Sequence, residues 1–144
     1  MSGTGSSPDA MRANAGFPLR ISLWLAQFMV AIPFIFGGYV KLTKPIGELA
    51  KLMAWTAEHP WLARGTALID IAGGVGIVLP ALLRIAPRLT IYAAFGCVAL
   101  QLCAITFHVS RGEAALTPMN FGFLALAAFV GWGRLTRAPV LPRG

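Results

Sequence analysis

The 144-residue chain is unusually apolar: 57% of its residues are hydrophobic, only 12% are charged, and its mean hydropathy is +0.72. About a quarter of the residues of a soluble domain are charged, so this composition excludes an ordinary water-soluble protein and indicates a membrane protein. The net charge of +7 does not favour nucleic-acid binding, because the basic residues stand at the ends of apolar stretches and in short loops, where they orient helices in a bilayer.

Four apolar stretches, each about 20 residues long, are predicted to form helices that cross the membrane. A hydrocarbon core of about 30 Å needs about 20 helical residues, and in lipid each backbone amide must be satisfied within its own segment. Between the charged residues that bracket each stretch, Asp70 is the only charge. The sequence therefore predicts an all-α fold, a four-transmembrane-helix bundle in one membrane domain at residues 19–135. The spans are expected at residues 19–40, 64–83, 88–108 and 118–132.

Two tails and one longer connection lie outside the predicted spans. Residues 1–18 are rich in Ser, Gly and Ala without an apolar period, which predicts a disordered N-terminal tail. Residues 136–144 are predicted to form a short basic C-terminal tail. Residues 43–58 are too polar to span, but their apolar positions recur at helical spacing, which predicts one short amphipathic helix at the membrane interface.

The basic residues predict the orientation of the bundle. With both termini in the cytoplasm, seven basic residues lie on the cytoplasmic side and five on the outer side. This is the bias that the positive-inside rule describes. The N-terminus and the C-terminus are therefore both expected to be cytoplasmic.

Polar residues of all four spans are predicted to gather at the outer end of the bundle, because successive spans alternate in direction. They are Lys41 at the end of the first span, Asp70 near the start of the second, His108 at the end of the third and Asn120 near the start of the fourth. Gln101 lies two turns deeper than His108 on about the same helix face. The inner end is expected to hold only ordinary flanking arginines.

The loop after the third span adds Arg111 and Glu113 to this outer cluster. Gly73 and Gly74 follow Asp70 by about one turn and are expected to let two helices pack closely. Two cysteines in the third span, Cys97 and Cys103, are too far apart along a helix to form a disulfide with each other.

Each polar side chain also has a structural explanation that the sequence leaves open. Asp70 can fix helix packing through a salt bridge, and Lys41 can anchor a helix end at the interface. His108 can bind a backbone carbonyl, and Gln101 can bind a neighbouring helix. The convergence of these polar residues on one end favours a functional site.

Two kinds of function fit this cluster. A carboxylate beside an imidazole near one membrane face can pass protons to or from a reducible headgroup such as a quinone, so Asp70 and His108 are the candidate catalytic pair, with Lys41 or Arg111 stabilising negative charge. Alternatively, the same groups form a polar cleft that docks a partner protein or a lipid headgroup. No metal site is expected, because neither His59 nor His108 has a histidine or carboxylate at i+4.

Three sequence blocks resemble the DoxX-like membrane proteins: "FGGYVKLTKPIGELAKL", "ALIDIAGGVGIVLPALLRIAPRLTIYAA" and "ITFHVSRGEAALTPMN". The resemblance covers about residues 21–134 and implies a four-helix protein of the bacterial cytoplasmic membrane. It places the family's polar residues on Lys41, Asp70, His108, Arg111 and Glu113, with Asp70 where the family usually has Glu.

The resemblance also implies a redox setting, because the namesake of the family is the small subunit of a thiosulfate:quinone oxidoreductase. The leading hypothesis is an accessory subunit or assembly partner of a membrane redox system that is linked to quinone. The alternative is a stand-alone quinone-binding oxidoreductase that uses Asp70 and His108 for proton transfer. A small-solute transporter is a third, less favoured hypothesis, because apolar residues around Ile77 and Val98 interrupt a polar path.

Overall fold

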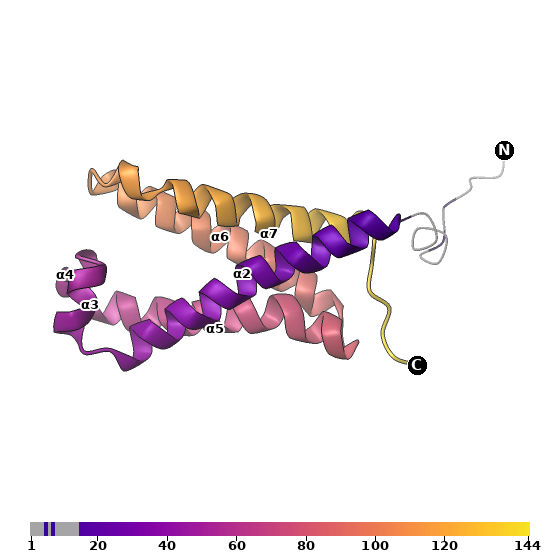
Figure 1. Ribbon diagram of the computed structural model, residues 1–144, viewed down its shortest axis with the longest axis horizontal. Coiled ribbons are helices and arrows are strands. Elements are labelled where there is room, and N and C mark those ends of the chain that lie inside the picture. The colour runs from indigo at the N-terminus through magenta and orange to yellow at the C-terminus, as the bar shows by residue number, and fades with distance from the viewer. Residues whose placement is uncertain (1–4, 6, 8–14) are drawn as a thin grey trace.

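The computed structural model describes Gly5, Ser7 and residues 15–144, and most of the expected N-terminal tail at residues 1–18 lies outside the described residues. The described chain is helical and contains no strand. Four long helices are joined by short connections, and Figure 1 shows their arrangement. The long helices are α2 (Phe17–Thr43), α5 (Pro60–Leu83), α6 (Arg88–Ser110) and α7 (Pro118–Thr136).

Proline sets the start of three of these helices. Pro18, Pro60 and Pro118 stand in the first turns of α2, α5 and α7, where a missing N–H costs nothing and the fixed φ suits a helix. As a result α5 begins at Pro60 rather than at residue 64, and α2 begins at Phe17 rather than at residue 19. At their other ends, α2 continues to Thr43 and α7 continues to Thr136, beyond the expected ends at residues 40 and 132.

The single amphipathic helix expected at residues 43–58 is instead two short helices. These are α3 (Ile46–Leu52) and α4 (Trp55–Glu58), and the backbone is extended at Met53 between them, with φ −139° and ψ 90°. Leu49 and Thr56 are fully buried. Each of the two short helices therefore directs one side chain into the fold.

The long helices form two antiparallel hairpins. Helix α2 packs along α5, and α6 packs along α7; these are the two most extensive helix contacts. Figure 1 shows that the hairpins separate toward the end that carries α3, α4 and the short 3₁₀ helix η1 (Ala114–Leu116). We call this the loop end.

At the opposite end, here called the terminal end, the start of α2 and the end of α7 meet. Ala15, Leu23 and Ala138 form a buried apolar cluster there. Between the two ends, a second cluster that includes Val30 and Ile77 joins the hairpins. The hairpins are therefore held together at the terminal end and at mid-height.

Three of the helices, α2, α5 and α6, are long and apolar enough to cross a membrane among the residues described. The predicted fourth span, α7, is not one of them, because Asn120 and Arg134 lower its mean hydropathy. Large apolar side chains on the outer faces of the bundle are exposed, among them Phe36, Leu68 and Phe121. In a membrane protein such side chains face lipid.

Candidate functional site

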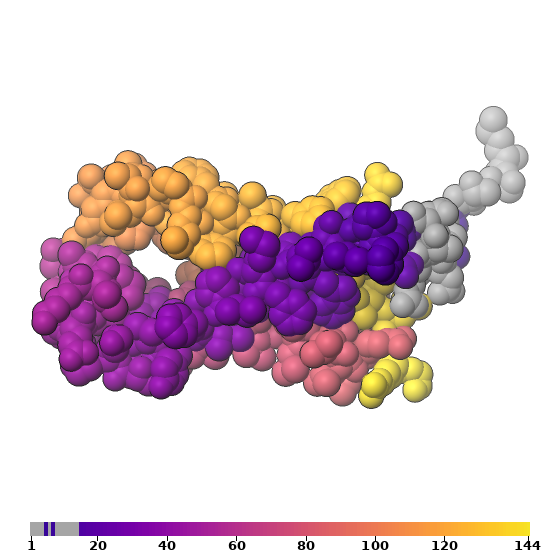
Figure 2. Space-filling model, viewed as in Figure 1, coloured from indigo at the N-terminus to yellow at the C-terminus, as the bar shows by residue number. Residues whose placement is uncertain are grey.

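A cleft of about 550 Å³ separates the two hairpins at the loop end. We call it the lateral cleft. Figure 2 shows it as a hollow between α2 with α3 and α4 on one side and the α6–α7 hairpin on the other. Because this view is across the helix axes, the cleft opens at the side of the bundle. Its polar lining residues are Lys41, Thr66, Asp70, Gln101, His108 and Asn120.

Apolar and aromatic side chains make up most of the remaining wall. Phe34 and Phe123 come from different hairpins and contact each other edge to face, with ring centroids 5.4 Å apart. Trp55 and Phe107 do the same near the loop end, at 5.6 Å. The cleft therefore combines an aromatic wall with a small number of polar groups, as small-molecule sites commonly do.

Lys41 and Asp70 form an ion pair inside the α2–α5 hairpin. Lys41 Nζ lies 2.5 Å from Asp70 Oδ2, and the two side chains are only 11% and 15% exposed. Lys41 also donates to Thr66 Oγ1 at 3.2 Å. The two charges therefore compensate each other in a largely water-excluded place, where an isolated charge would be costly.

The close approach of α2 and α5 makes this pair possible. A Cβ added at Gly38 would lie 2.7 Å from the backbone oxygen of Ala67, and one added at Gly74 would lie 2.9 Å from the backbone oxygen of Ala31. At Gly73 the nearest atom is Cys97 Sγ on α6, at 3.0 Å. Gly74 therefore belongs to the α2–α5 contact and Gly73 to the contact with α6.

Arg64, which sequence reasoning treated only as a flanking charge, closes the C-terminal end of α2. Its guanidinium donates to the carbonyl oxygen of Lys41 and, at 3.0 Å, to that of Lys44. These carbonyls belong to the end of α2, which has no further turn to satisfy them. Arg64 thereby helps to fix the position of Lys41 above Asp70.

His108 is held by Glu113 through a turn that glycine makes. Gly112 has φ +75°, a left-handed conformation that glycine adopts easily. The turn lets the backbone N–H of Glu113 donate to the carbonyl of His108 at 2.8 Å. The Glu113 carboxylate also lies 2.9 Å from His108 Nδ1. The sequence "RGE" therefore orients the imidazole at the edge of the lateral cleft.

Arg111 joins this loop to α4 on the other hairpin. Its Nη1 and Nη2 atoms lie 2.6 and 3.2 Å from the Glu58 carboxylate, and its Nε lies 3.2 Å from Glu113 Oε1. We call the bidentate Glu58–Arg111 contact the latch. Sequence reasoning missed Glu58, because it is far from the other polar residues along the chain and belongs to a surface helix.

The pKa values of the two latch residues and of Glu113 are shifted from their usual values. The hydrogen bond from Arg111 is the largest effect that holds the pKa of Glu58 below its usual value. For Glu113, the contact with His108 is the largest effect, and Arg111 adds to it, so its pKa is also lowered. The hydrogen bond to Glu58 in turn raises the pKa of Arg111. All three groups are therefore charged at neutral pH.

Gln101 and Asn120 connect the two helices of the second hairpin. Asn120 Nδ2 donates to Gln101 Oε1 at 2.7 Å, and Gln101 is almost fully buried. Both residues line the lateral cleft. This pair therefore places an amide on the cleft wall across from the other hairpin.

The predicted cluster is thus assembled at one end, but in separate pairs. Lys41 binds Asp70, and His108 binds Glu113, with no hydrogen bond between Asp70 and His108. Both members of the candidate proton-handling pair line the same cleft. Within the described part of the chain, no three His, Cys, Asp and Glu side chains gather as a metal site would require.

The expectation that the other end holds only flanking arginines is wrong. Arg134 is 4% exposed, and its Nε and Nη2 atoms donate to Gln27 Oε1 at 2.9 and 2.6 Å. Gly133 next to it is in close contact with Leu23, so α7 approaches α2 tightly enough to draw the arginine inward. The only sequence signal was Gln27, a fully buried amide in an apolar span.

The sequence profile of the DoxX-like family matches residues 25–130, which include every residue that lines the lateral cleft. The chain belongs to the DoxX-like family. The resemblance inferred from the sequence blocks is thereby confirmed. No protein of curated function and no solved structure matches this DoxX-like chain.

Proposed function

We propose that this DoxX-like protein is the membrane subunit of a redox system and binds a quinone in its lateral cleft. The observation that carries this proposal is the cleft itself, with aromatic walls and six polar lining residues at one end of an apolar bundle. Its volume of about 550 Å³ falls in the range of about 300–1,000 Å³ that small-molecule sites occupy. A lateral opening suits a ligand that arrives from the bilayer.

The proposal includes α7 as a fourth membrane span. The first three spans leave the end of α6 at the loop end, whereas Ala138, just after α7, packs with Ala15 and Leu23 at the terminal end. Helix α7 must therefore cover the distance between the two ends. Its 19 residues give about 28 Å of helix, close to the thickness of the hydrocarbon core.

The terminal end faces the cytoplasm in this proposal. Of the Lys and Arg residues that the structure describes, six stand at the terminal end and five at the loop end. This asymmetry agrees with the positive-inside rule. The lateral cleft then lies toward the outer face of the cytoplasmic membrane.

Polar groups of the cleft suit the two carbonyl oxygens of a quinone. Lys41 and the Asn120–Gln101 amides come from opposite hairpins and can donate hydrogen bonds from two sides. His108, hydrogen-bonded to Glu113, can supply a proton to a reduced headgroup. Because Asp70 is engaged by Lys41, its part is to hold the lysine rather than to act as a free base.

The second candidate, a stand-alone quinone oxidoreductase, rests on the presence of Asp70 and His108 in one cleft. A transporter is less favoured, because Val30 and Ile77 are fully buried in the apolar cluster below the cleft. That cluster separates the polar groups of the cleft from the terminal end.

Binding is tested with decyl-ubiquinone and the purified protein in phosphatidylcholine nanodiscs. Quinones quench tryptophan fluorescence, and Trp55 lines the cleft, so saturable quenching is expected. It should weaken about tenfold in Asn120→Leu, which removes one hydrogen-bonding group from the cleft. Trp55→Phe should remove the saturable part of the signal. Equal quenching in wild type and both variants would contradict the proposal.

The subunit and enzyme alternatives are separated with His108→Ala in native membranes. If the protein is a subunit, a partner that co-purifies in mild detergent is expected, and quinone reduction requires that partner. If the purified chain alone reduces decyl-ubiquinone with an added electron donor, and His108→Ala abolishes this activity, the stand-alone enzyme replaces the subunit.

A further inference from the structure

Arg134 carries a buried charge that no acidic side chain of the described residues neutralises. Besides its two bonds to Gln27 Oε1, it donates to the carbonyl of Ala138 at 3.2 Å, and its Cζ lies 4.9 Å from the Trp24 ring centroid. All of these partners are neutral. Gln27 is itself fixed, because its Nε2 donates to the Ile77 carbonyl at 2.6 Å. A buried cation without a counter-charge is costly, which favours the binding of an anion beside Arg134.

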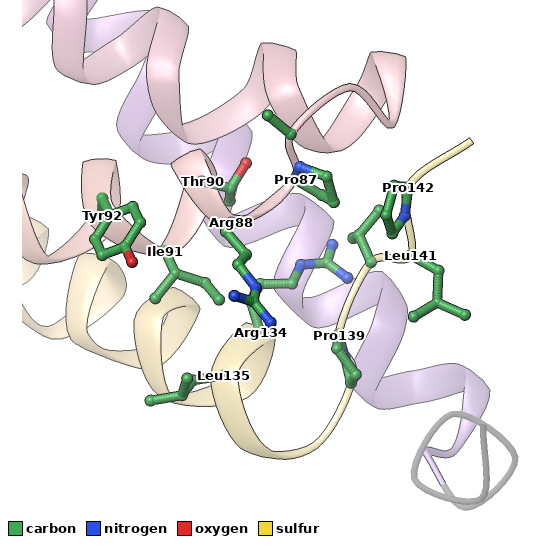
Figure 3. A pocket seen from close by; sticks show the side chains of 12 residues that line it. Pro87, Arg88, Thr90, Ile91, Tyr92, Arg134, Leu135, Pro139, Leu141 and Pro142 are labelled. Carbon is green, nitrogen blue, oxygen red and sulfur yellow. The ribbon is translucent and has the colours of Figure 1, made fainter. Parts of the chain in front are cut away.

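A second cleft, of about 670 Å³, lies directly beside this arginine. We call it the terminal cleft. It is bounded by the start of α6, the end of α7 and residues 139–142 of the C-terminal segment, and Figure 3 shows the Arg88 side chain extending across it. Arg84 holds the C-terminal segment in place, because its Nε donates to the Leu141 carbonyl and its own carbonyl accepts from the Arg143 N–H.

Thr90 provides a second, independent observation at the terminal cleft. This residue lines the terminal cleft and is 1% exposed. Its Oγ1 atom is buried and has no hydrogen-bond partner in the described structure. Buried hydroxyl groups are nearly always hydrogen-bonded. Arg88, Arg134 and Thr90 all line this cleft, and guanidinium and hydroxyl groups are donors from which phosphate oxygens accept hydrogen bonds.

We propose that the terminal cleft binds the phosphate of an anionic phospholipid such as phosphatidylglycerol. Arg88 and Arg134 supply the positive charge and Thr90 supplies a hydroxyl donor. The side of the cleft is apolar and outward-facing, because Tyr92 and Leu135 are 68% and 55% exposed. These side chains can contact the acyl chains while the headgroup lies in the cleft. The terminal cleft is distinct from the lateral cleft, and this proposal does not depend on quinone binding.

The test compares nanodiscs of phosphatidylcholine alone with nanodiscs that also contain phosphatidylglycerol. Phosphatidylglycerol should raise the thermal unfolding temperature, and native mass spectrometry should detect it bound after detergent extraction. Arg88→Gln should weaken this binding roughly tenfold, since it removes one charge-assisted hydrogen bond. Thr90→Val, which is close in shape, should weaken it less. Arg134 is kept, because its loss would also break the link between α2 and α7.

Arg137→Gln is the matched control, because Arg137 is an exposed arginine at the same end that does not line the cleft. Its binding of phosphatidylglycerol should equal that of wild type.

Inorganic phosphate added to phosphatidylcholine nanodiscs separates the two sources of the phosphate group. A rise in the unfolding temperature with phosphatidylglycerol but not with inorganic phosphate supports the lipid. A rise with inorganic phosphate that is absent in Arg88→Gln supports the same site with a free ion. An equal loss of phosphatidylglycerol binding in Arg88→Gln and Arg137→Gln, or no change in unfolding temperature with either phosphate source, overturns the proposal.

Discussion

At the scale of single residues, the Lys41–Asp70 pair shows how a membrane helix tolerates an acid. The two charges lie 2.5 Å apart, and each is mostly excluded from water. Neither side chain would be stable there without the other, because the desolvation of each is compensated only by its partner. The sequence predicts that both residues reach the same end of the bundle. It does not predict that they bind each other, since that depends on how closely α2 and α5 approach.

Asp70→Asn should destabilise the protein by roughly 3 to 5 kcal/mol, because it leaves the Lys41 ammonium buried without a counter-charge. The double variant Lys41→Met with Asp70→Asn should recover much of this loss, since it buries no net charge. The free energy of unfolding, measured by SDS titration in mixed micelles, checks both variants. A double variant no more stable than Asp70→Asn would show that the charge balance is not the cause.

At the scale of the elements, glycine determines how tightly the α2–α5 hairpin closes. Gly37 and Gly38 are neighbours on α2, but only Gly38 faces α5 closely. A Cβ at Gly38 would meet the Ile71 side chain at 2.6 Å and a backbone oxygen at 2.7 Å, whereas a Cβ at Gly37 would meet nothing within 4 Å. Alanine substitutions at Gly38 and Gly37 can therefore be compared to measure how much the close α2–α5 contact contributes to the free energy of unfolding.

Gly38→Ala should lower the free energy of unfolding by about 1 to 3 kcal/mol, because the helices must move apart to admit the methyl group. Gly37→Ala should leave stability unchanged or raise it by up to about 1 kcal/mol, since alanine favours the helix. Unfolding in SDS measures both variants. Equal effects of the two substitutions would contradict the close packing at Gly38.

At the scale of the whole molecule, the latch between Glu58 and Arg111 connects the two hairpins across the lateral cleft. The pKa values of Glu58 and Glu113 are both lowered in the folded protein. A carboxyl group with a lowered pKa stabilises the fold above its usual pKa of 4.5. This contribution is lost as the pH falls through the folded value. Acid should therefore weaken the loop end.

The unfolding temperature should accordingly be constant near neutral pH and decrease as the pH falls below about 4.5. Glu58→Gln should make this decrease smaller, because one of the two shifted carboxyl groups is gone. The control is Glu48→Gln, which removes an exposed carboxylate that lies 3.8 Å from Lys44 on the same surface segment. Thermal unfolding between neutral and acidic pH measures all three proteins. A Glu58→Gln profile identical to wild type would exclude the latch as an acid-sensitive contact.

The helices could be predicted from the sequence because charged residues bracket each apolar stretch. Alternation of the helices then placed the polar residues at a common end. Their partners could not be predicted, because pairing depends on side-chain geometry: Asp70 binds Lys41, and His108 binds Glu113. The burial of Arg134 was missed for a related reason, since an arginine near the end of a span has the same sequence pattern whether it faces water or folds inward.

The connections of the chain have a consequence for the size of ligand that the lateral cleft can admit. Each hairpin closes on itself at the loop end, so no backbone connection runs from one hairpin to the other across the mouth of the cleft; the single covalent joint between them is the four-residue turn at 84–87, at the far end. Spreading the two hairpin tips therefore stretches no peptide segment and breaks only side-chain contacts. The lateral cleft can therefore widen when a larger ligand binds. We expect it to accept quinones with bulky ring substituents better than a pocket enclosed by continuous chain would.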